Sequence, residues 1–237
     1  MSRSNQDRMG VKPQQDSGTP PPQQRSSSLE FVVPTEFVEL PSQGKFYPSG
    51  HPLYNQEVIE IRHMTTKEED ILNSPTLIQQ GIAIDRMLQN VLVDQRINVD
   101  DLLVGDKNAL IISARLHGYG AAYDTKVACP NCGETSEFSF DLGEFKNVFS
   151  PEKIIEDFGA TVTERGTFKF KIEKTDYTVE IKLPNGHDEK RLAKILEHKK
   201  KRNLLEGVTS DLLRTIIVSV NDIEDESEIN AFINTLP

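Results

Sequence analysis

The stretch from Ala128 to Gly133, "ACPNCG", holds the only two cysteines among the 237 residues. Two cysteines separated by two residues, followed by glycine, are typical of a zinc knuckle, in which one tight turn presents two thiolates. Structural zinc normally takes four protein ligands, and the sequence has no second such pair. Three interpretations stay open for Cys129 and Cys132: zinc bound with ligands from elsewhere or from a second subunit, a degenerate knuckle without metal, or a thiol redox pair.

The rest of the chain supplies little chemistry to complete such a site. Its histidines stand in no Cys/His spacing pattern, although His117 precedes the cysteine turn closely enough to fold back toward it. The phosphate-binding, dinucleotide-binding, nucleophile-elbow and HExxH motifs are all missing from the sequence. The sequence therefore predicts no enzyme, and no cofactor apart from zinc at Cys129 and Cys132.

A second stretch, "LPSQGKFYP" from Leu40 to Pro48, is a turn-rich loop that carries aromatic residues. Gly44 is expected to adopt a positive φ, and the prolines keep their flanks extended. Aromatic side chains in such a loop pack either onto the core of their own chain or onto a partner. We predict a partner-binding site formed by Gly44, Phe46, Tyr47 and Pro48, with packing onto the core as the alternative.

Elements on either side of these motifs follow from periodicity. Alternation predicts a strand over 57–64, and Thr65 or Thr66 opens a short helix as a capping box. An apolar stripe predicts one helix from Ser74 to Leu92. A further helix runs through "DKNALIISARLHGYG" and is expected to end at Gly118.

The period changes to two after Tyr119. Segments 123–128 and 135–142 alternate around the cysteine turn and predict a β-hairpin, and 167–183 predicts a second one. Three helices are expected to follow, over 188–202, 210–220 and 227–236, with Ser210 and Ser227 as caps. The fold class is α+β: a helical core with two β-hairpins, one carrying the CPxCG zinc-knuckle-like turn, and a disordered N-terminal arm.

Composition divides the chain into regions. The first residues are rich in Gln, Ser and Pro and have little to bury, which predicts disorder. We interpret this arm as a tether that folds on a partner or as a solvated tail. The predicted regions are the arm at 1–29, extended segments, loop and helices at 30–118, the hairpin region at 119–185 and the C-terminal helices at 186–237.

Charge and hydropathy limit the partners. The formal net charge is −10, which disfavours direct binding to nucleic acid or to anionic membranes. The sequence contains no apolar run of membrane-spanning length and no signal-peptide pattern at its start, so we expect a cytoplasmic protein. These features favour a protein that works by binding other proteins.

Several segments occur in an order that resembles a known family. They are the Leu-Pro-x-x-Gly-x-x-Tyr-Pro loop, "MTTKEEDIL", "DLLVGDKN" and the CPxCG turn, and the similarity runs from Phe37 to the C-terminus. Together they resemble the baseplate hub subunits and hub assembly proteins of T-even-type contractile-tailed bacteriophages. The Pro/Gln-rich arm departs from that pattern, and relatives are expected to carry a further polar segment after "FINTLP".

The resemblance implies a non-enzymatic tail protein, a subunit or an assembly chaperone of the baseplate hub. Its partners would be other hub and tail proteins, and its location the host cytoplasm during assembly and the virion tail baseplate. The alternative is a zinc-ribbon-like adaptor for a nucleic-acid or protein machine, which requires bound zinc and, for nucleic acid, a basic face.

Overall fold

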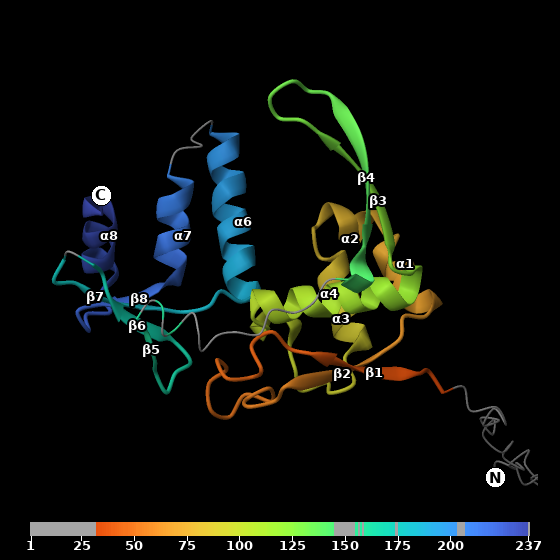
Figure 1. Ribbon diagram of the computed structural model, residues 1–237, viewed down its shortest axis with the longest axis horizontal. Coiled ribbons are helices and arrows are strands. Elements are labelled where there is room, and N and C mark those ends of the chain that lie inside the picture. The colour runs from red at the N-terminus through yellow and green to blue at the C-terminus, as the bar shows by residue number, and fades with distance from the viewer. Residues whose placement is uncertain are drawn as a thin grey trace, which may run out of the picture. The chain divides into compact units, whose positions relative to one another are not determined.

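The computed structural model describes residues 32–144, 155, 157, 159–173, 175–202 and 207–236. The chain divides into residues 1–32 and a compact unit over 33–237, which contains every element named below. The α+β class is confirmed, because helices alternate with small antiparallel sheets (Figure 1). The disordered arm predicted at 1–29 lies outside the described residues and stays a prediction.

The first sheet is an antiparallel pair of strands joined by the Pro/Gly loop. Strand β1 spans Thr35–Glu39 and β2 spans Val58–Arg62, with Thr35 opposite Arg62 and Glu39 opposite Val58. Alternation along these strands buries Val38, Ile59 and Ile61 on one face. The strand predicted over 57–64 is therefore confirmed in position.

Helices follow this sheet, with α1 at Thr66–Leu72, α2 at Pro75–Gln79, α3 at Ala83–Val91 and α4 at Val104–Tyr119. A capping box between Thr65 and Glu68 opens α1, as the sequence predicts. The prediction of a single helix from Ser74 to Leu92 is wrong, because the helix is interrupted between α2 and α3. Gly81 has a φ of 69° there, a left-handed conformation that ends a helix.

Helix α4 is the centre of the first core. It runs to Tyr119 and ends at Gly120, whose φ is 81°, rather than at the predicted Gly118. The buried apolar side chains that pack together come from β1, β2, the Pro/Gly loop, α3, the 3₁₀ turn Val99–Asp101 and α4. They are Val38, Leu40, Phe46, Tyr47, Leu53, Ile59, Ile61, Met87, Leu88, Val91, Leu92, Ile97, Val99, Leu102, Leu103, Ala109, Leu110 and Ala114.

The predicted cysteine hairpin follows α4. Strand β3 spans Ala122–Ala128 and β4 spans Thr135–Asp141, and they form a two-stranded ladder of their own. Pairing runs from Ala122 opposite Asp141 to Ala128 opposite Thr135, so the cysteine turn lies at the tip. A 3₁₀ turn, Leu142–Glu144, follows β4.

The C-terminal part has a four-stranded antiparallel sheet in the order β5-β6-β7-β8. Its strands are Thr161–Val162, Phe168–Lys171, Thr178–Ile181 and Ile217–Val220. Strands β6 and β7 are the second predicted hairpin. The helix predicted over 210–220 ends early, because the β-branched run from Ile217 forms β8 and pairs with β7.

Three helices accompany this sheet: α6 at Gly186–Lys201, α7 at Val208–Ile216 and α8 at Glu226–Thr235. Asp225 caps α8 through its side chain, not the predicted Ser227. A second, separate core of buried side chains joins β7, β8 and α8. It consists of Val179, Ile217, Val220, Ile229, Phe232 and Ile233.

An ion-pair cluster and backbone contacts join α6 to the elements of the first core. Lys107 on α4 lies 2.8 Å from Asp85 and 3.0 Å from Glu189, and Lys190 lies 3.0 Å from Asp85 and 2.5 Å from Asp100. Burial lowers the pKa of Lys107, but its two carboxylate partners outweigh that effect and raise it. This cluster therefore holds charged ammonium groups between α3, α4 and α6.

Candidate functional site

The Pro/Gly loop is held by a buried carboxylate at the start of α4. Asp106 is fully buried, and its Oδ1 accepts a hydrogen bond from the Ser42 backbone N–H at 2.9 Å. Its Oδ2 accepts from the Ser42 hydroxyl at 2.6 Å and from the Tyr47 hydroxyl at 2.7 Å. Asp106 also lies in the first turn of α4, where the helix dipole favours a negative charge.

Tyr47 links that carboxylate to the backbone of α4. Its hydroxyl donates to Asp106 and accepts from the Leu103 N–H at 3.1 Å, and its ring stacks on His51 with centroids 4.5 Å apart. Burial, followed by the charge of Asp106, raises the pKa of Tyr47 well above its usual range. Tyr47 is therefore a neutral hydrogen-bond donor that fixes the loop.

Gly44 has a φ of 68°, which confirms the predicted positive φ. A Cβ at this position would lie 2.5 Å from the carbonyl oxygens of both Leu53 and Gln56, so the close return of the loop requires glycine. Phe46 packs on Phe168 with ring centroids 4.9 Å apart. The loop thus has one fixed shape, set by buried contacts.

The structure places the four predicted partner-binding residues differently. Phe46 and Tyr47 are 8% and 2% exposed and Gly44 is buried, whereas Pro48 is exposed. Of the two alternatives for the aromatics, the structure has packing onto the core of the chain. Partner binding at this loop stays a prediction, and only Pro48 of the four residues lies at the surface of the described chain.

The cysteine turn is closed by a backbone hydrogen bond. The Gly133 N–H donates to the Cys129 carbonyl at 2.8 Å, and both cysteines are free and exposed. Hydrogen bonds from the backbone N–H groups of Cys132 and Asn131 lower the pKa of the Cys129 thiol. Among the described residues, no cluster of potential ligands includes either cysteine, so a zinc site at this turn stays a prediction.

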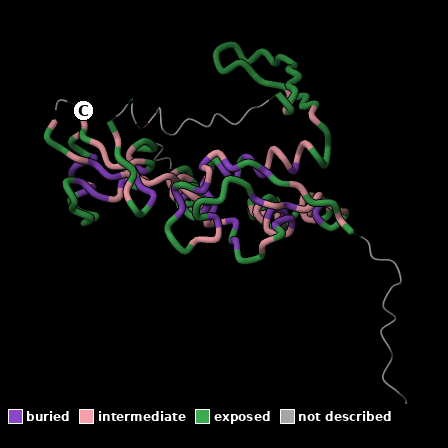
Figure 2. Tube along the Cα trace, turned by 60° about the horizontal axis from the view of Figure 1, so that its bottom comes forward, coloured by how far each residue is buried: buried purple, intermediate pink, exposed green. Residues whose placement is uncertain are grey.

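The hairpin behind this turn has one aromatic face and one polar face. Tyr123 lies opposite Phe140, Thr125 opposite Phe138 and Val127 opposite Ser136, so these side chains share one side of the ladder. Their apolar members are between 43% and 48% exposed: Tyr123, Val127, Phe138 and Phe140. Figure 2 shows exposure along nearly the whole hairpin.

The opposite face carries Asp124, Lys126, Glu137 and Ser139, with an ion pair of 2.7 Å between Lys126 and Glu137. An amphipathic two-stranded hairpin of this kind has little stability of its own in water. An exposed aromatic face with polar surroundings is typical of a protein-interaction site. We refer to Tyr123, Val127, Phe138 and Phe140 as the aromatic face.

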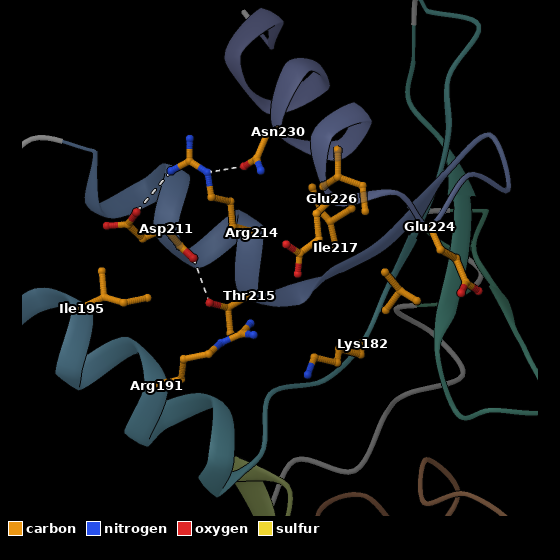
Figure 3. Close-up of a pocket in the computed structure, with 12 residues that line it drawn as sticks. Lys182, Arg191, Ile195, Asp211, Arg214, Thr215, Ile217, Glu224, Glu226 and Asn230 are labelled. Carbon is orange, nitrogen blue, oxygen red and sulfur yellow. Dashed lines mark hydrogen bonds and ion pairs between the residues drawn. The ribbon is translucent and has the colours of Figure 1, made fainter.

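A cavity of about 380 Å³ lies between α6, α7, β8 and α8 (Figure 3). Charged side chains of both signs line it, and the Arg214 guanidinium lies 3.2 Å from Asp211 and donates to the Asn230 side chain at 2.6 Å. Thr215 donates to the Asp211 carbonyl at 2.9 Å.

Comparison with protein families gives a match over most of the chain. The model of the family described as "T4 bacteriophage base plate protein" matches residues 33–237. The chain belongs to this family. The search of curated proteins and the search of solved structures give no match.

Membership confirms the resemblance at the level of a T4-type phage baseplate protein. It suggests a structural tail protein that contacts other baseplate proteins in the virion tail. Within the part of the chain that the structure describes, no helix is both long and apolar enough to cross a membrane. The aromatic face and both cysteines of the turn are exposed.

One group of potential metal ligands could not be recognised from the sequence. Glu36, His63 and His117 are far apart along the chain, yet their potential ligand atoms all lie within 4.8 Å of one another. His117 therefore does not fold toward Cys129 and Cys132, but lies beside β1. The spacing of these residues gave no signal, because only the pairing of β1 with β2 and the packing of α4 bring them together.

Proposed function

We propose that this protein is a component of the baseplate hub, either a subunit or an assembly factor, that binds another baseplate protein through the aromatic face of the β3–β4 hairpin. Family membership and the resemblance to hub proteins support the setting. The observation that carries the proposal is the exposure of Tyr123, Val127, Phe138 and Phe140 on one face.

Physical reasoning favours this face over the Pro/Gly loop. Aromatic side chains contribute a large contact area at a low entropy cost and are frequent among the residues that dominate binding energy. Phe46 and Tyr47 of the loop already fill the core of the chain, whereas the aromatic side chains of the hairpin are half exposed. Among the described residues, neither β3 nor β4 pairs with a third strand. Both edges of this ladder can therefore pair with a strand of a partner protein.

The contact is tested by site-specific crosslinking. A photoreactive phenylalanine analogue replaces Phe138 in infected cells, and the crosslinked partner is identified by mass spectrometry. We expect a baseplate protein at this position and none with the analogue at Glu137, which is on the polar face of the same strand. A crosslink only to a second copy of the chain would instead indicate self-association, and equal crosslinking from both faces would contradict the proposal.

Subunit and assembly factor are distinguished by counting. Quantitative peptide measurement on purified virions and on assembly intermediates gives the copy number in each. Presence in both identifies a subunit of the tail, and presence in intermediates alone identifies a factor that departs. Absence from both would contradict a role in the hub.

For the predicted partner-binding site at Gly44, Phe46, Tyr47 and Pro48, we limit the proposed contact surface to its exposed part. Its buried members fix the shape of the loop, and Pro48 with the exposed Ser49 and Gly50 is the part that would meet a partner. A photoreactive residue at Ser49 tests this second contact in the same way.

A zinc-ribbon-like adaptor remains the alternative function, favoured by the N–H groups that face the Cys129 sulfur. Since the sequence holds two cysteines, the remaining ligands must be other residue types or come from another chain. Loss of zinc from an isolated assembly when both cysteines are replaced by serine would support this adaptor.

A further inference from the structure

Three metal-ligating side chains converge beside the end of α4. Glu36 lies on β1, His63 follows the last residue of β2, and His117 is in the last turn of α4. The His117 Nδ1 lies 2.8 Å from the Glu36 Oε2, and the rings of His63 and His117 stack with centroids 5.0 Å apart. Their potential ligand atoms form the one such cluster found in the described part of the chain.

The donor set suits a first-row divalent metal ion. Imidazole and carboxylate are ligands of zinc, and two histidines with one acidic residue form a known catalytic or open zinc set. Ligand atoms around tetrahedral zinc lie roughly 3.3 Å apart, given zinc–nitrogen bonds of about 2.0–2.1 Å. The three atoms are within 4.8 Å, and the His117 side chain is 43% exposed, so a modest side-chain rotation closes the set.

A second interaction orients the carboxylate. The Ser113 hydroxyl donates to the Glu36 Oε1 at 2.9 Å, which leaves Oε2 directed at His117. Metal sites commonly have such supporting hydrogen bonds, which fix the direction of each ligand. Backbone contacts fix the other partner, because the His63 N–H donates to the Pro34 carbonyl at 2.9 Å.

We propose that Glu36, His63 and His117 bind a zinc ion, with a fourth position open to water or to a side chain of a neighbouring protein. Each histidine binds the ion as a neutral imidazole, through a ring nitrogen that has a free lone pair. The ion ties β1 and the end of β2 to the last turn of α4, the turn from which the β3–β4 hairpin departs. This site is independent of the proposed contact at the aromatic face.

Metal binding is measured on the full-length protein after removal of metal with a chelator. Zinc is titrated by calorimetry, and cobalt is used as a coloured substitute whose absorption separates thiolate ligands from imidazole and carboxylate ligands. The double variant H63Q/H117Q removes both imidazoles, and H198Q is the matched control, because His198 is an exposed histidine outside the cluster. The double variant C129S/C132S removes the other potential zinc site.

We expect the wild type, H198Q and C129S/C132S to bind zinc, with cobalt in C129S/C132S showing no thiolate absorption. H63Q/H117Q should lose at least tenfold in affinity at this site, and Ser113→Ala should lose about tenfold, the lower end of the range for a supporting residue. Zinc should also raise the melting temperature of C129S/C132S, and should no longer do so when H63Q/H117Q is added to C129S/C132S.

Two results would overturn the proposal. One is the absence of zinc binding in C129S/C132S, and the other is unchanged binding when H63Q/H117Q is added to C129S/C132S. If H63Q/H117Q fails to fold by circular dichroism, the single variant H117Q takes its place, because the His117 side chain is half exposed. Unchanged zinc affinity in a folded H117Q variant would equally reject the site.

Discussion

The Pro/Gly loop and the β3–β4 hairpin carry similar aromatic side chains and treat them in opposite ways. Phe46 and Tyr47 are buried, whereas Phe138 and Phe140 are 47% and 44% exposed. In the loop, Tyr47 bonds to the buried Asp106 carboxylate, and the backbone at Gly44 lies close to the backbone of Leu53 and Gln56. In the hairpin, β3 and β4 pair only with each other among the described residues. Tyr47 is buried where Asp106 accepts its hydrogen bond and Phe46 is buried against Phe168, whereas the aromatic side chains of β3 and β4 stay half exposed and form a surface.

The largest effect is expected from removing that acceptor. Asp106→Ala leaves the Ser42 N–H, the Ser42 hydroxyl and the Tyr47 hydroxyl buried without their partner. The free energy of unfolding should fall by about 3–5 kcal/mol, measured by urea denaturation. Asp94→Ala is the control, because the ion pair of Asp94 with Arg96 is solvent-exposed. An equal loss of stability in both variants would show that the buried hydrogen bonds of Asp106 do not stabilise the fold more than a surface ion pair does.

A somewhat smaller effect separates two glycines of the same loop region. Gly44→Ala places a methyl group against backbone oxygens of Leu53 and Gln56 at a φ of 68°, and should cost about 3 kcal/mol. Gly50 also has a positive φ, 96°, but an added Cβ meets nothing within 4 Å. Gly50→Ala should therefore cost only about 1–2 kcal/mol. Equal melting temperatures for the two variants would show that the close approach at Gly44 is not required.

The backbone conformation of this loop could largely be predicted from the sequence, but the burial of its aromatic side chains could not. The positive φ of Gly44 follows from turn chemistry, and the strand over 57–64 follows from alternation. The partner of Tyr47 lies 59 residues away, at Asp106, and nothing in local sequence marks that aspartate as buried. The choice between core and partner was open because it depends on this long-range contact.

The same limit applies to the hairpin, the helices and the candidate metal ligands. Alternation located both hairpin strands, and the capping box located the start of α1. Helical periodicity continued across Gly81 and into Ile217, where a left-handed glycine and a sheet partner interrupt it. The cysteine spacing was visible in the sequence, whereas Glu36, His63 and His117 meet only after folding.

The Tyr47 interaction should appear as a dependence of stability on alkaline pH. Its pKa is raised in the folded protein, so the unfolded state loses the tyrosine proton first as pH rises above about 10. The free energy of unfolding should then fall with pH, by at most about 1.4 kcal/mol per unit from this group. The difference between wild type and Tyr47→Phe, measured by denaturation from pH 8 to 11, should shrink over that range. A constant difference would mean that the hydroxyl is not protected by folding.

Substitutions on the aromatic face should leave stability nearly unchanged and reduce binding. The double variant Phe138→Ser, Phe140→Ser removes exposed rings, so we expect each change to alter the free energy of unfolding by about 0.5 kcal/mol or less. Crosslinking from a photoreactive residue at Tyr123 should fall severalfold in this background. Ser139→Ala on the polar face should change neither quantity. A large loss of stability would show that the Phe138 and Phe140 rings stabilise the fold, as the buried Phe46 does.

The smallest effect concerns the tip of the same hairpin. The N–H groups of Cys132 and Asn131 favour the Cys129 thiolate, and these backbone donors persist when Cys132 is replaced by serine. In Cys132→Ser, alkylation of Cys129 by iodoacetamide should therefore reach half its maximal rate at a pH below the ordinary thiol pKa of about 8.5. The midpoint should return toward that value in urea, because unfolding removes the donors. An unchanged midpoint in urea would show that the turn does not hold the sulfur in a knuckle-like cradle, and would weaken the case for zinc at this end of the hairpin.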